Sequence, residues 1–298
     1  MANPKIGFIG IGLMGHGMAR NIVEKGYALT TIAHRNRAPL DDLVSRGASA
    51  AASVADLARQ SDIIFLCLTS SIEVASVVSE LKPGLSRGSV IVDCSTSEPT
   101  VTERLSREMT DIGVDYADAP LSRTPKEAEA GTLDCMVGAD QAVFDRIRPV
   151  IACWAAKIVH IGGVGDGHRM KLLNNFISLG YGALYAEALT LAQKVGIDVA
   201  TFDSVIRGGR MDCGFYQTFM GYALEGNREA HRFTLSNAAK DMRYVEAMAN
   251  AAQVATPLSS AIKNSYAAAV ATGGNGPENY VPHLVDFVGL ANGVSRPG

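Results

Sequence analysis

The sequence predicts an α/β protein in which a doubly wound, mostly parallel sheet is followed by an all-helical second domain. Apolar runs of strand length alternate with polar or helical connectors through the first half. A glycine-rich loop joins the first apolar run to a helical pattern. From residue 169 onward helical periodicity continues and strand signals almost vanish. We therefore expect one domain over residues 1–164 and a second over residues 165–298.

The apolar runs of the first half have the lengths of strands. The first run, KIGFIG, starts at Lys5, and the helical pattern over residues 13–25 is closed by Gly26. Runs that are apolar on both faces are typical of parallel strands covered by helices. The later runs are ALTTIA, DIIFLCL, SVIVDCS, VDYADAPL, LDCMVG and AKIVHIG.

The pattern changes at GGVGDGH, a glycine-rich joint that begins at Gly162. A long helix is expected over residues 169–195, because apolar residues recur there at helical spacing. Clefts between two such domains are common ligand sites. Shorter helices are expected around residues 198–208, 212–225, 234–253 and 256–271.

Composition excludes several classes of protein. The chain has 298 residues, a net charge of −3 and 47% hydrophobic residues, so no basic excess points to nucleic acid. No apolar window of transmembrane length occurs, and the first strand begins too early for a signal peptide. Its cysteines are odd in number, widely spaced and without a C-x-x-C pair, which indicates reduced thiols. We expect a cytoplasmic protein without a membrane span, a disulfide or a metal.

The glycine loop is the clearest binding motif. G-x-G-x-x-G occurs as Gly10, Gly12 and Gly15, directly after a strand and at the start of a helix. The first glycine permits a tight turn, the second lets the backbone approach a pyrophosphate, and the third allows close packing. The helix N-terminus would supply N–H donors to the phosphates. We expect Leu13 and Met14 within this loop to contact the same dinucleotide.

The end of the second strand predicts which dinucleotide binds. An acidic residue there would bind the ribose 2′-hydroxyl of NAD, but no acid occurs before Asp41. His34, Arg35, Asn36 and Arg37 suit a 2′-phosphate instead. The alternative is an ordinary solvated basic loop. We expect NADP(H) to be preferred over NAD(H).

Four polar residues interrupt the apolar helix that begins at Arg169. Lys171, Asn174, Asn175 and Ser178 follow an i, i+3, i+4, i+7 spacing and share one face. Burying an ammonium and two amides costs several kcal/mol, roughly, unless each finds a partner. The partner is either a ligand or the protein itself, with the lysine reaching solvent and the amides bridging the domains.

Together these features resemble the β-hydroxyacid dehydrogenase family, which includes 3-hydroxyisobutyrate dehydrogenase and tartronate semialdehyde reductase. The resemblance covers nearly the whole chain. It rests on four separated stretches: FIGIGLMGHGMARN; DCSTSEP with DAPLSRTPKEAEAGTLDCMVG; GHRMKLLNN; and AAKDM.

The resemblance implies a Rossmann domain, a helical domain, and a homodimer or homotetramer. It implies that Lys171 is catalytic and that Asn175 binds substrate. As the catalytic residue, Lys171 would protonate the substrate oxygen as hydride reaches the carbon, or deprotonate the alcohol in reverse. The other residues that it places near substrate or cofactor are Leu68, Ser95, Thr96, Ser122 and Lys240.

The chain departs from the family at Ser122, Arg123 and Thr124, where most members have Ser-Gly-Gly. An arginine there resembles sulfolactaldehyde reductase, which carries Gly-Arg-Thr and holds a sulfonate with that arginine. Asn174 and Ser178 stand at the matching helix positions, so this resemblance implies that Arg123, Thr124, Asn174 and Ser178 bind substrate. An arginine fork suits carboxylate, phosphate and sulfonate alike, so charge alone does not separate these substrates. The alternative is a salt bridge to Glu127 or Glu129.

We therefore expect an enzyme that interconverts a small anionic semialdehyde and its hydroxy acid. The candidate aldehydes are sulfolactaldehyde, tartronate semialdehyde, succinic semialdehyde and methylmalonate semialdehyde. A different class, an NADP-binding module without turnover, is disfavoured because such relatives typically lack the equivalent of Lys171. Imine reductases usually carry Asp or Tyr at that position. The sequence leaves the substrate and the physiological direction open.

Overall fold

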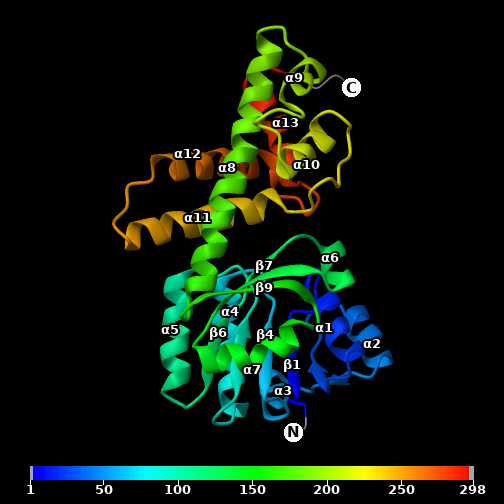
Figure 1. The fold of residues 1–298 in the computed structure, drawn as a ribbon, viewed down its shortest axis with the longest axis vertical. Coiled ribbons are helices and arrows are strands. Elements are labelled where there is room, and N and C mark those ends of the chain that lie inside the picture. Colours follow the sequence, from blue (N-terminus) through cyan, green and yellow to red (C-terminus); the bar gives the residue numbers. More distant parts are fainter. Residues whose placement is uncertain (1–2, 295–298) are drawn as a thin grey trace. The chain divides into compact units, whose positions relative to one another are not determined.

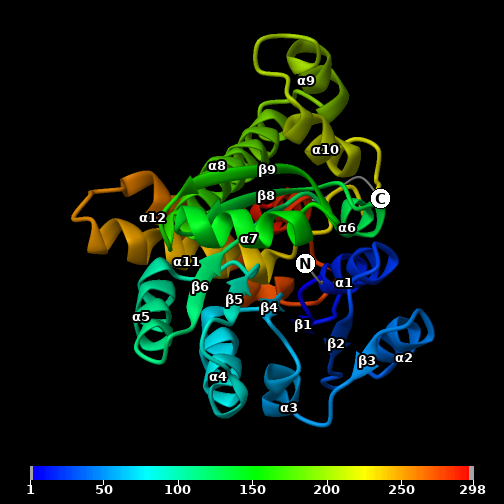
Figure 2. The same cartoon turned by 60° about the horizontal axis from the view of Figure 1, so that its bottom comes forward.

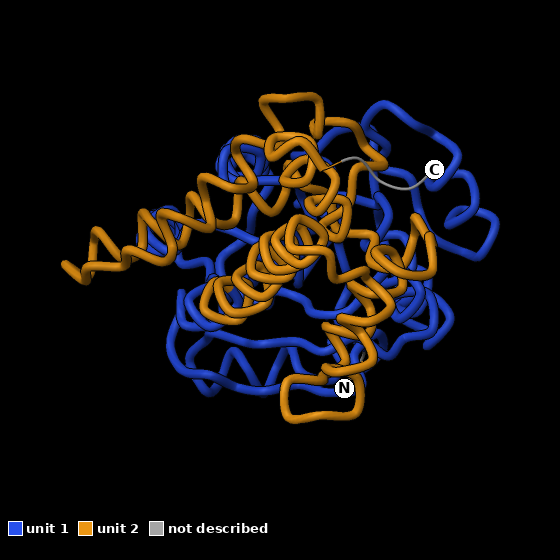
Figure 3. The backbone as a smooth tube through the Cα atoms, turned by 90° about the horizontal axis from the view of Figure 1, so that it is seen from above, with its two compact units in different colours: residues 1–171 blue, residues 172–298 orange. Residues whose placement is uncertain are grey.

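The computed structural model of the protein describes residues 3–294. The chain divides into two compact units, residues 1–171 and residues 172–298, which Figure 3 draws in different colours. The division falls inside one continuous helix, α8 (Asp166–Lys194). The expected domain boundary after residue 164 comes just before this helix begins.

The first unit contains the sheet (Figure 1). Neighbouring strands from β3 to β6 are parallel, and β8 pairs in antiparallel fashion with both β6 and β7. This is the mostly parallel, doubly wound sheet that the alternating pattern predicts. In sheet order the strands are β3 (Ser49–Ala50), β2 (Leu29–Thr31), β1 (Ile6–Ile9), β4 (Ile63–Leu66), β5 (Val90–Asp93), β6 (Asp115–Asp118), β8 (Leu133–Gly138) and β7 (Leu121–Ser122), with β9 (Ala155–Gly162) parallel to β8.

One expected run forms two strands. VDYADAPL contributes β6 and then β7, separated by Ala119 and Pro120. Proline has no N–H to continue a ladder, and the chain changes from a parallel to an antiparallel neighbour at this point. The short strand β3 was not expected, because its two residues, Ser49 and Ala50, are exposed and carry no apolar pattern.

Helices cover both faces of the sheet, and Figure 2 shows α3, α4 and α5 side by side on one of them. Successive strand residues alternate between the faces: Ile63 and Phe65 pack with α1, α2 and α7, whereas Ile64 and Leu66 pack with α3, α4 and α5. The helices of this unit are α1 (Gly15–Glu24), α2 (Ala38–Ser45), α3 (Val54–Arg59), α4 (Ser71–Leu81), α5 (Pro99–Thr110), α6 (Pro125–Ala130) and α7 (Gln141–Ile151).

The second unit is helical, as its periodicity predicts. Leu172, Leu179 and Leu189 of α8 lie in a core with buried aromatic residues of α10 and apolar residues of α11 and α12. The unit's further helices are α9 (Val199–Ile206), α10 (Gly214–Ala223), α11 (Leu235–Ala251) and α12 (Pro257–Ala269), each close to its expected range, and α13 (Leu284–Ala291), for which no range was expected. Within residues 3–294, no helix combines the length and apolar character needed to cross a membrane.

Candidate active site

The glycine loop lies between β1 and α1, beside the point where the strand order changes direction. Gly10 has a φ of +98°, and a Cβ on it would lie 2.2 Å from the Cys67 carbonyl oxygen. A Cβ on Gly15 would lie 2.0 Å from the Gly10 carbonyl oxygen. A Cβ on Gly12 would meet nothing within 4 Å. Two glycines are therefore required by packing, whereas a side chain at Gly12 would meet open space, and its predicted contact with a pyrophosphate stays a prediction.

The loops after β1, β4 and β5 meet at the carboxyl edge of the sheet. The Leu68 N–H donates to the Ser95 hydroxyl at 2.9 Å, and Ser95 is almost fully buried. Thr96 is half-buried beside it. In open parallel sheets this edge is where ligands bind. The expected cofactor residues Gly10, Leu68 and Thr96 thus lie on neighbouring loops.

The basic loop after β2 is exposed. Arg37 pairs with Asp41 at 3.0 Å, and the Asn36 side chain accepts from the Ala38 N–H at 3.0 Å. Arg35 forms no ion pair within the part of the chain that the structure describes, residues 3–294. His34 is also exposed. Arg35 is therefore the cation of this loop best able to meet a phosphate.

Arg123 lies in an unusual backbone conformation. Its φ is +86°, in the left-handed region that favours glycine. The side chain is 51% exposed, and its Nε lies 3.1 Å from Asp134 Oδ1, not at either glutamate considered from the sequence. Ser122 just before it is half-buried at the end of β7.

Thr124 begins helix α6 as its N-cap. Its hydroxyl and its backbone N–H both donate to the Glu127 carboxylate, and the Glu127 N–H reaches back to complete a capping box. The hydrogen bond from the Thr124 hydroxyl lowers the pKa of Glu127. Thr124 thus has a structural task, and its predicted contact with substrate stays a prediction.

Helix α8 carries the polar face predicted from the sequence. Lys171 and Ser178 are half-buried, Asn174 is exposed, and Asn175 is buried. The Asn175 amide donates to Asp241 Oδ2 at 2.7 Å. The buried amide is therefore satisfied by the protein itself, which leaves its predicted contact with substrate untested.

Asp241 links two predicted residues within the helical unit. Its carboxylate accepts from Asn175, and its Oδ1 lies 3.1 Å from Lys240 Nζ. Lys240 also lies over the Tyr244 ring, 5.3 Å from the ring centroid. Asp241 was not among the predicted site residues, although it lies inside the AAKDM stretch. The available signal in the sequence was an acidic residue directly after Lys240, within an apolar helical pattern.

Three further buried polar residues were missed: Asp93, Asp118 and His168, all in the first unit. Each aspartate ends an apolar strand at the carboxyl edge of the sheet. An acid directly after a buried strand was the available signal. Burial raises the pKa of the Asp118 carboxyl, and the nearby His168 opposes that rise.

The comparisons with known proteins agree with this architecture. A family model described as the NAD binding domain of 6-phosphogluconate dehydrogenase matches residues 5–162. A second, described as the NAD-binding domain of NADP-dependent 3-hydroxyisobutyrate dehydrogenase, matches residues 165–280. The chain belongs to the β-hydroxyacid dehydrogenase family.

Relatives match over most of their length. The chain is 39% identical to 2-(hydroxymethyl)glutarate dehydrogenase of Eubacterium barkeri over 68% of each chain. It is 30% identical to 3-sulfolactaldehyde reductase of Escherichia coli, over 90% of this chain and 91% of that one. The structure of 3-hydroxyisobutyrate dehydrogenase from Mycobacterium tuberculosis with L-serine superposes with a TM-score of 0.85 at 25% identity, covering 95% and 99% of the two chains.

The family membership confirms the expected class of activity and of cofactor. Members of the β-hydroxyacid dehydrogenase family are NAD(P)-dependent oxidoreductases that interconvert hydroxy acids and their aldehydes. The substrates of the related enzymes are small hydroxy acids or semialdehydes. Which substrate this β-hydroxyacid dehydrogenase takes, and which residues hold it, stay predictions.

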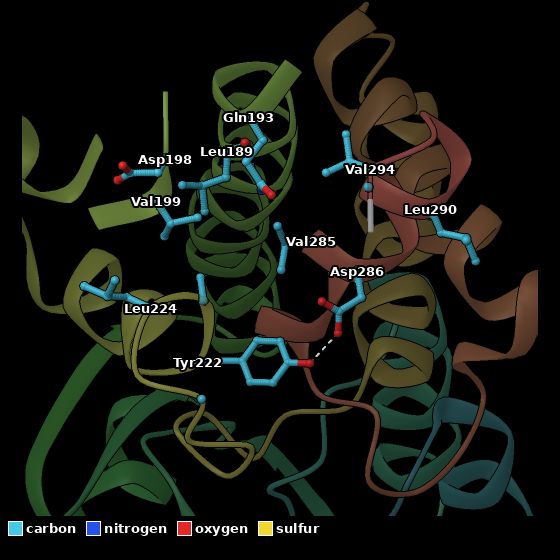
Figure 4. A pocket seen from close by; sticks show the side chains of 13 residues that line it. Leu189, Gln193, Asp198, Val199, Tyr222, Leu224, Val285, Asp286, Leu290 and Val294 are labelled. Carbon is cyan, nitrogen blue, oxygen red and sulfur yellow. Dashed lines mark hydrogen bonds between the residues drawn. The ribbon is translucent and has the colours of Figure 1, made fainter. Parts of the chain in front are cut away.

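A separate cavity of about 650 Å³ lies in the helical unit (Figure 4). Its walls are mostly apolar, and the Tyr222 hydroxyl donates to the Asp286 carboxylate inside it. None of the residues predicted from the sequence lines this cavity. Within residues 3–294, no group of three or more His, Cys, Asp or Glu side chains is arranged to hold a metal ion.

Proposed function

We propose that this β-hydroxyacid dehydrogenase reduces a small anionic semialdehyde with NADPH, or oxidises the corresponding hydroxy acid, and that Lys171 is its acid–base residue. The observation that carries the proposal is the position of the first turn of α8. The N–H groups of Gly165 and His168 donate to Asp118 at the carboxyl edge of the sheet. Lys171 follows one turn later in the helix. It therefore lies near the carboxyl edge of the sheet, the edge that also holds the glycine loop.

The chain's residues would act on the oxygen of the substrate. The nicotinamide, when bound, supplies or accepts the hydride at the carbon. The Lys171 ammonium would hydrogen-bond the carbonyl oxygen, stabilise the charge that develops there, and donate a proton. In the oxidative direction the neutral amine would remove the proton from the alcohol. A lysine suits this task because its pKa responds readily to burial.

We propose that Arg123 binds the anionic end of the substrate, with Ser122, Thr124, Asn174, Asn175 and Ser178 contacting its polar groups. A non-glycine residue at positive φ costs of order 1–3 kcal/mol, and such strain gathers at functional sites. The half-exposed Arg123 side chain leaves donors available to a ligand. A sulfonate, as in sulfolactaldehyde, and a carboxylate, as in tartronate, succinic or methylmalonate semialdehyde, both fit an arginine fork.

We infer a preference for NADP(H) over NAD(H). Arg35 and His34 are exposed on the loop after β2, where a ribose 2′-phosphate would lie. Arg35→Ser should raise the Kd of NADPH by about tenfold or more, since it removes a charge-assisted hydrogen bond worth about 1.5–3 kcal/mol. The Kd of NADH should change little. Arg59→Ser, a change of the same charge on the exposed end of α3, is the control.

We propose a homodimer or homotetramer formed through the helical unit. Ile177, Leu184 and Leu191 of α8 recur every two turns and are 58%, 60% and 64% exposed. Ile177 and Leu184 line an apolar groove of about 450 Å³ that α12 completes with Leu258. Leu184→Glu should lower the mass measured by light scattering. Val205→Glu on α9, where the side chain is 74% exposed, should leave the mass unchanged.

A cytoplasmic location is proposed on the cysteines. Cys67, Cys94, Cys135, Cys153 and Cys213 are all free thiols. Burial raises the pKa of Cys67 to about 12, so it is not a reactive thiolate. Such unpaired thiols are typical of a reducing compartment. Cell fractionation tests this: recovery of the enzyme outside the cytoplasmic fraction would contradict the proposal.

The deciding experiment compares initial rates of NADPH oxidation with sulfolactaldehyde and with the three carboxylate semialdehydes. Lys171→Ala should abolish turnover and leave the Kd of NADPH within about threefold of the wild type, because the amine meets the substrate. Lys194→Ala, the same change at the exposed far end of the same helix, should keep full turnover. Turnover retained in Lys171→Ala would refute the assignment. NADPH binding without turnover of any aldehyde would favour the non-catalytic module.

A further inference from the structure

His168 is a fully buried histidine that the mechanism above does not use. It lies in the first turn of α8, one turn before Lys171. Its Nδ1 lies 2.8 Å from the Thr102 hydroxyl of α5, and its Nε2 lies 3.1 Å from the Ser95 carbonyl oxygen. A carbonyl oxygen only accepts hydrogen bonds, so Nε2 carries a proton and donates a hydrogen bond to the Ser95 oxygen. The ring therefore joins three separate segments of the first unit.

The backbone of the same turn is held by a buried carboxylate. The Gly165 and His168 N–H groups donate to the two Asp118 oxygens, each at 2.6 Å. A Cβ added to Gly167 would lie 2.8 Å from Asp118 Oδ2, and one added to Gly138 would lie 2.5 Å from Asp118 Oδ1. The turn thus packs so closely on the carboxylate that no side chain fits between them. This close packing fixes the position of the first turn of α8 relative to the end of β6.

The loop that His168 contacts is held from its other side as well. Asp93 accepts from the Ser95 N–H at 2.9 Å and from the Ser97 hydroxyl at 2.7 Å. The Ser95 carbonyl that accepts the hydrogen bond from His168 belongs to the peptide joining Ser95 to Thr96. That peptide lies in the part of the loop predicted to border nicotinamide and substrate. His168 therefore links this peptide directly to the helix turn that precedes Lys171.

We propose that His168 is a positioning residue that holds the turn of α8 carrying Lys171 in register with the Ser95–Thr96 peptide. This inference rests on the proposed function of Lys171. The donor at Nε2 is the essential feature, because it makes the contact to the loop. Nδ1 and Thr102 fix the rotation of the ring. Loss of the Nε2 donor would let the lysine and the loop shift relative to one another, and misplacement by about 1 Å can cost about 100-fold in rate.

The test replaces His168 by side chains whose amide nitrogen takes the place of one of the two ring nitrogens. The amide nitrogen of glutamine reaches the position of Nε2, and that of asparagine reaches the position of Nδ1. His168→Gln should keep kcat/KM within about threefold of the wild type, whereas His168→Asn and His168→Leu should lose about 100-fold. The loss should fall on kcat, and the Kd of NADPH should stay within about threefold in all three variants.

His160 supplies the matched control. It is a half-buried histidine of the same unit whose Nε2 also contacts a backbone carbonyl, that of Ala139 at 2.7 Å, but it lies on β9. His160→Leu removes the same type of hydrogen bond and should keep wild-type turnover. Full turnover in folded His168→Leu, or an equal loss in His168→Gln and His168→Leu, would overturn the proposal.

Amide hydrogen exchange gives a readout that needs no turnover. His168→Leu should speed exchange both at residues 95–98 and at residues 165–171, because the link between the two segments is lost. His168→Gln should exchange like the wild type. Unchanged exchange at residues 95–98 in His168→Leu would overturn the proposed link. A wild type that turns over no aldehyde would refute the proposed function instead, and the exchange data would still decide whether His168 couples the two segments.

Discussion

Replacing Arg123 by glycine and by alanine separates its backbone from its side chain. At a φ of +86°, a non-glycine residue costs about 1–2 kcal/mol relative to ordinary backbone conformations. Glycine removes this cost but adds about 0.4–1 kcal/mol of chain entropy to the unfolded state. Alanine keeps the strained backbone. Both variants lose the exposed pair with Asp134, which is worth about 0–1 kcal/mol.

The glycine variant should therefore be more stable than the alanine variant by about 0–1.6 kcal/mol, with a middle value of about 0.8 kcal/mol. For a unit of this size, that corresponds to a Tm higher by about 1–3 °C, measured by differential scanning calorimetry. A more stable alanine variant would contradict the reasoning from strain.

Activity should respond to the side chain alone. A hydrogen bond to a charged group contributes about 1.5–3 kcal/mol, so both variants should lose about 10- to 150-fold in kcat/KM for the preferred anionic aldehyde. Asp134→Asn is the control, because it removes the partner of Arg123 and leaves the arginine in place. If both Arg123 variants keep kcat/KM within threefold, Arg123 is structural. A selective loss with sulfolactaldehyde would identify the sulfonate as the natural anion.

Two further predictions concern the glycine loop and α6. Gly15→Ala should lower Tm by several degrees, since its Cβ would lie 2.0 Å from the Gly10 carbonyl oxygen, whereas Gly12→Ala should keep Tm and raise the Kd of NADPH about tenfold; an equal Tm loss in both would contradict this contrast. The hydrogen bond from the Thr124 hydroxyl lowers the pKa of Glu127 from its ordinary value of 4.5. The contribution of the Glu127 carboxylate to the stability of the fold is therefore fully present above pH 4.5 and is lost as the pH falls through the lowered pKa. Glu127→Ala should lower the free energy of unfolding by about 1 kcal/mol at neutral pH, seen as a lower Tm, and the difference from the wild type should vanish in acid. A difference that persists in acid would contradict the role of Glu127 in the capping box.

Local patterns were sufficient for most of the elements, including the glycine loop between β1 and α1, but not for the short strand β3. Strand-length apolar runs, helical periodicity and the spacing of Gly10, Gly12 and Gly15 each depend on neighbouring residues, and the structure contains the corresponding elements. The split of one run at Pro120 was missed. Pro120 is a signal for the break in the ladder, but the antiparallel pairing of β7 with β8 depends on which strand lies alongside, and the sequence of that run does not contain this information.

Only the tertiary structure decided how the polar residues are paired. Asp93 and Asp118 are distant in sequence from His168, and the three residues form one buried cluster. Asp241 is distant from Asn175, and these two form another. Helical spacing predicted that Lys171, Asn174, Asn175 and Ser178 share one helix face, but it carries no information on partners from other elements. By itself, the sequence determined the local conformation, the family and the types of residue available for chemistry. Burial decided the rest, because a charged or amide group removed from water must find a partner, and that partner is set by the packing of the whole unit.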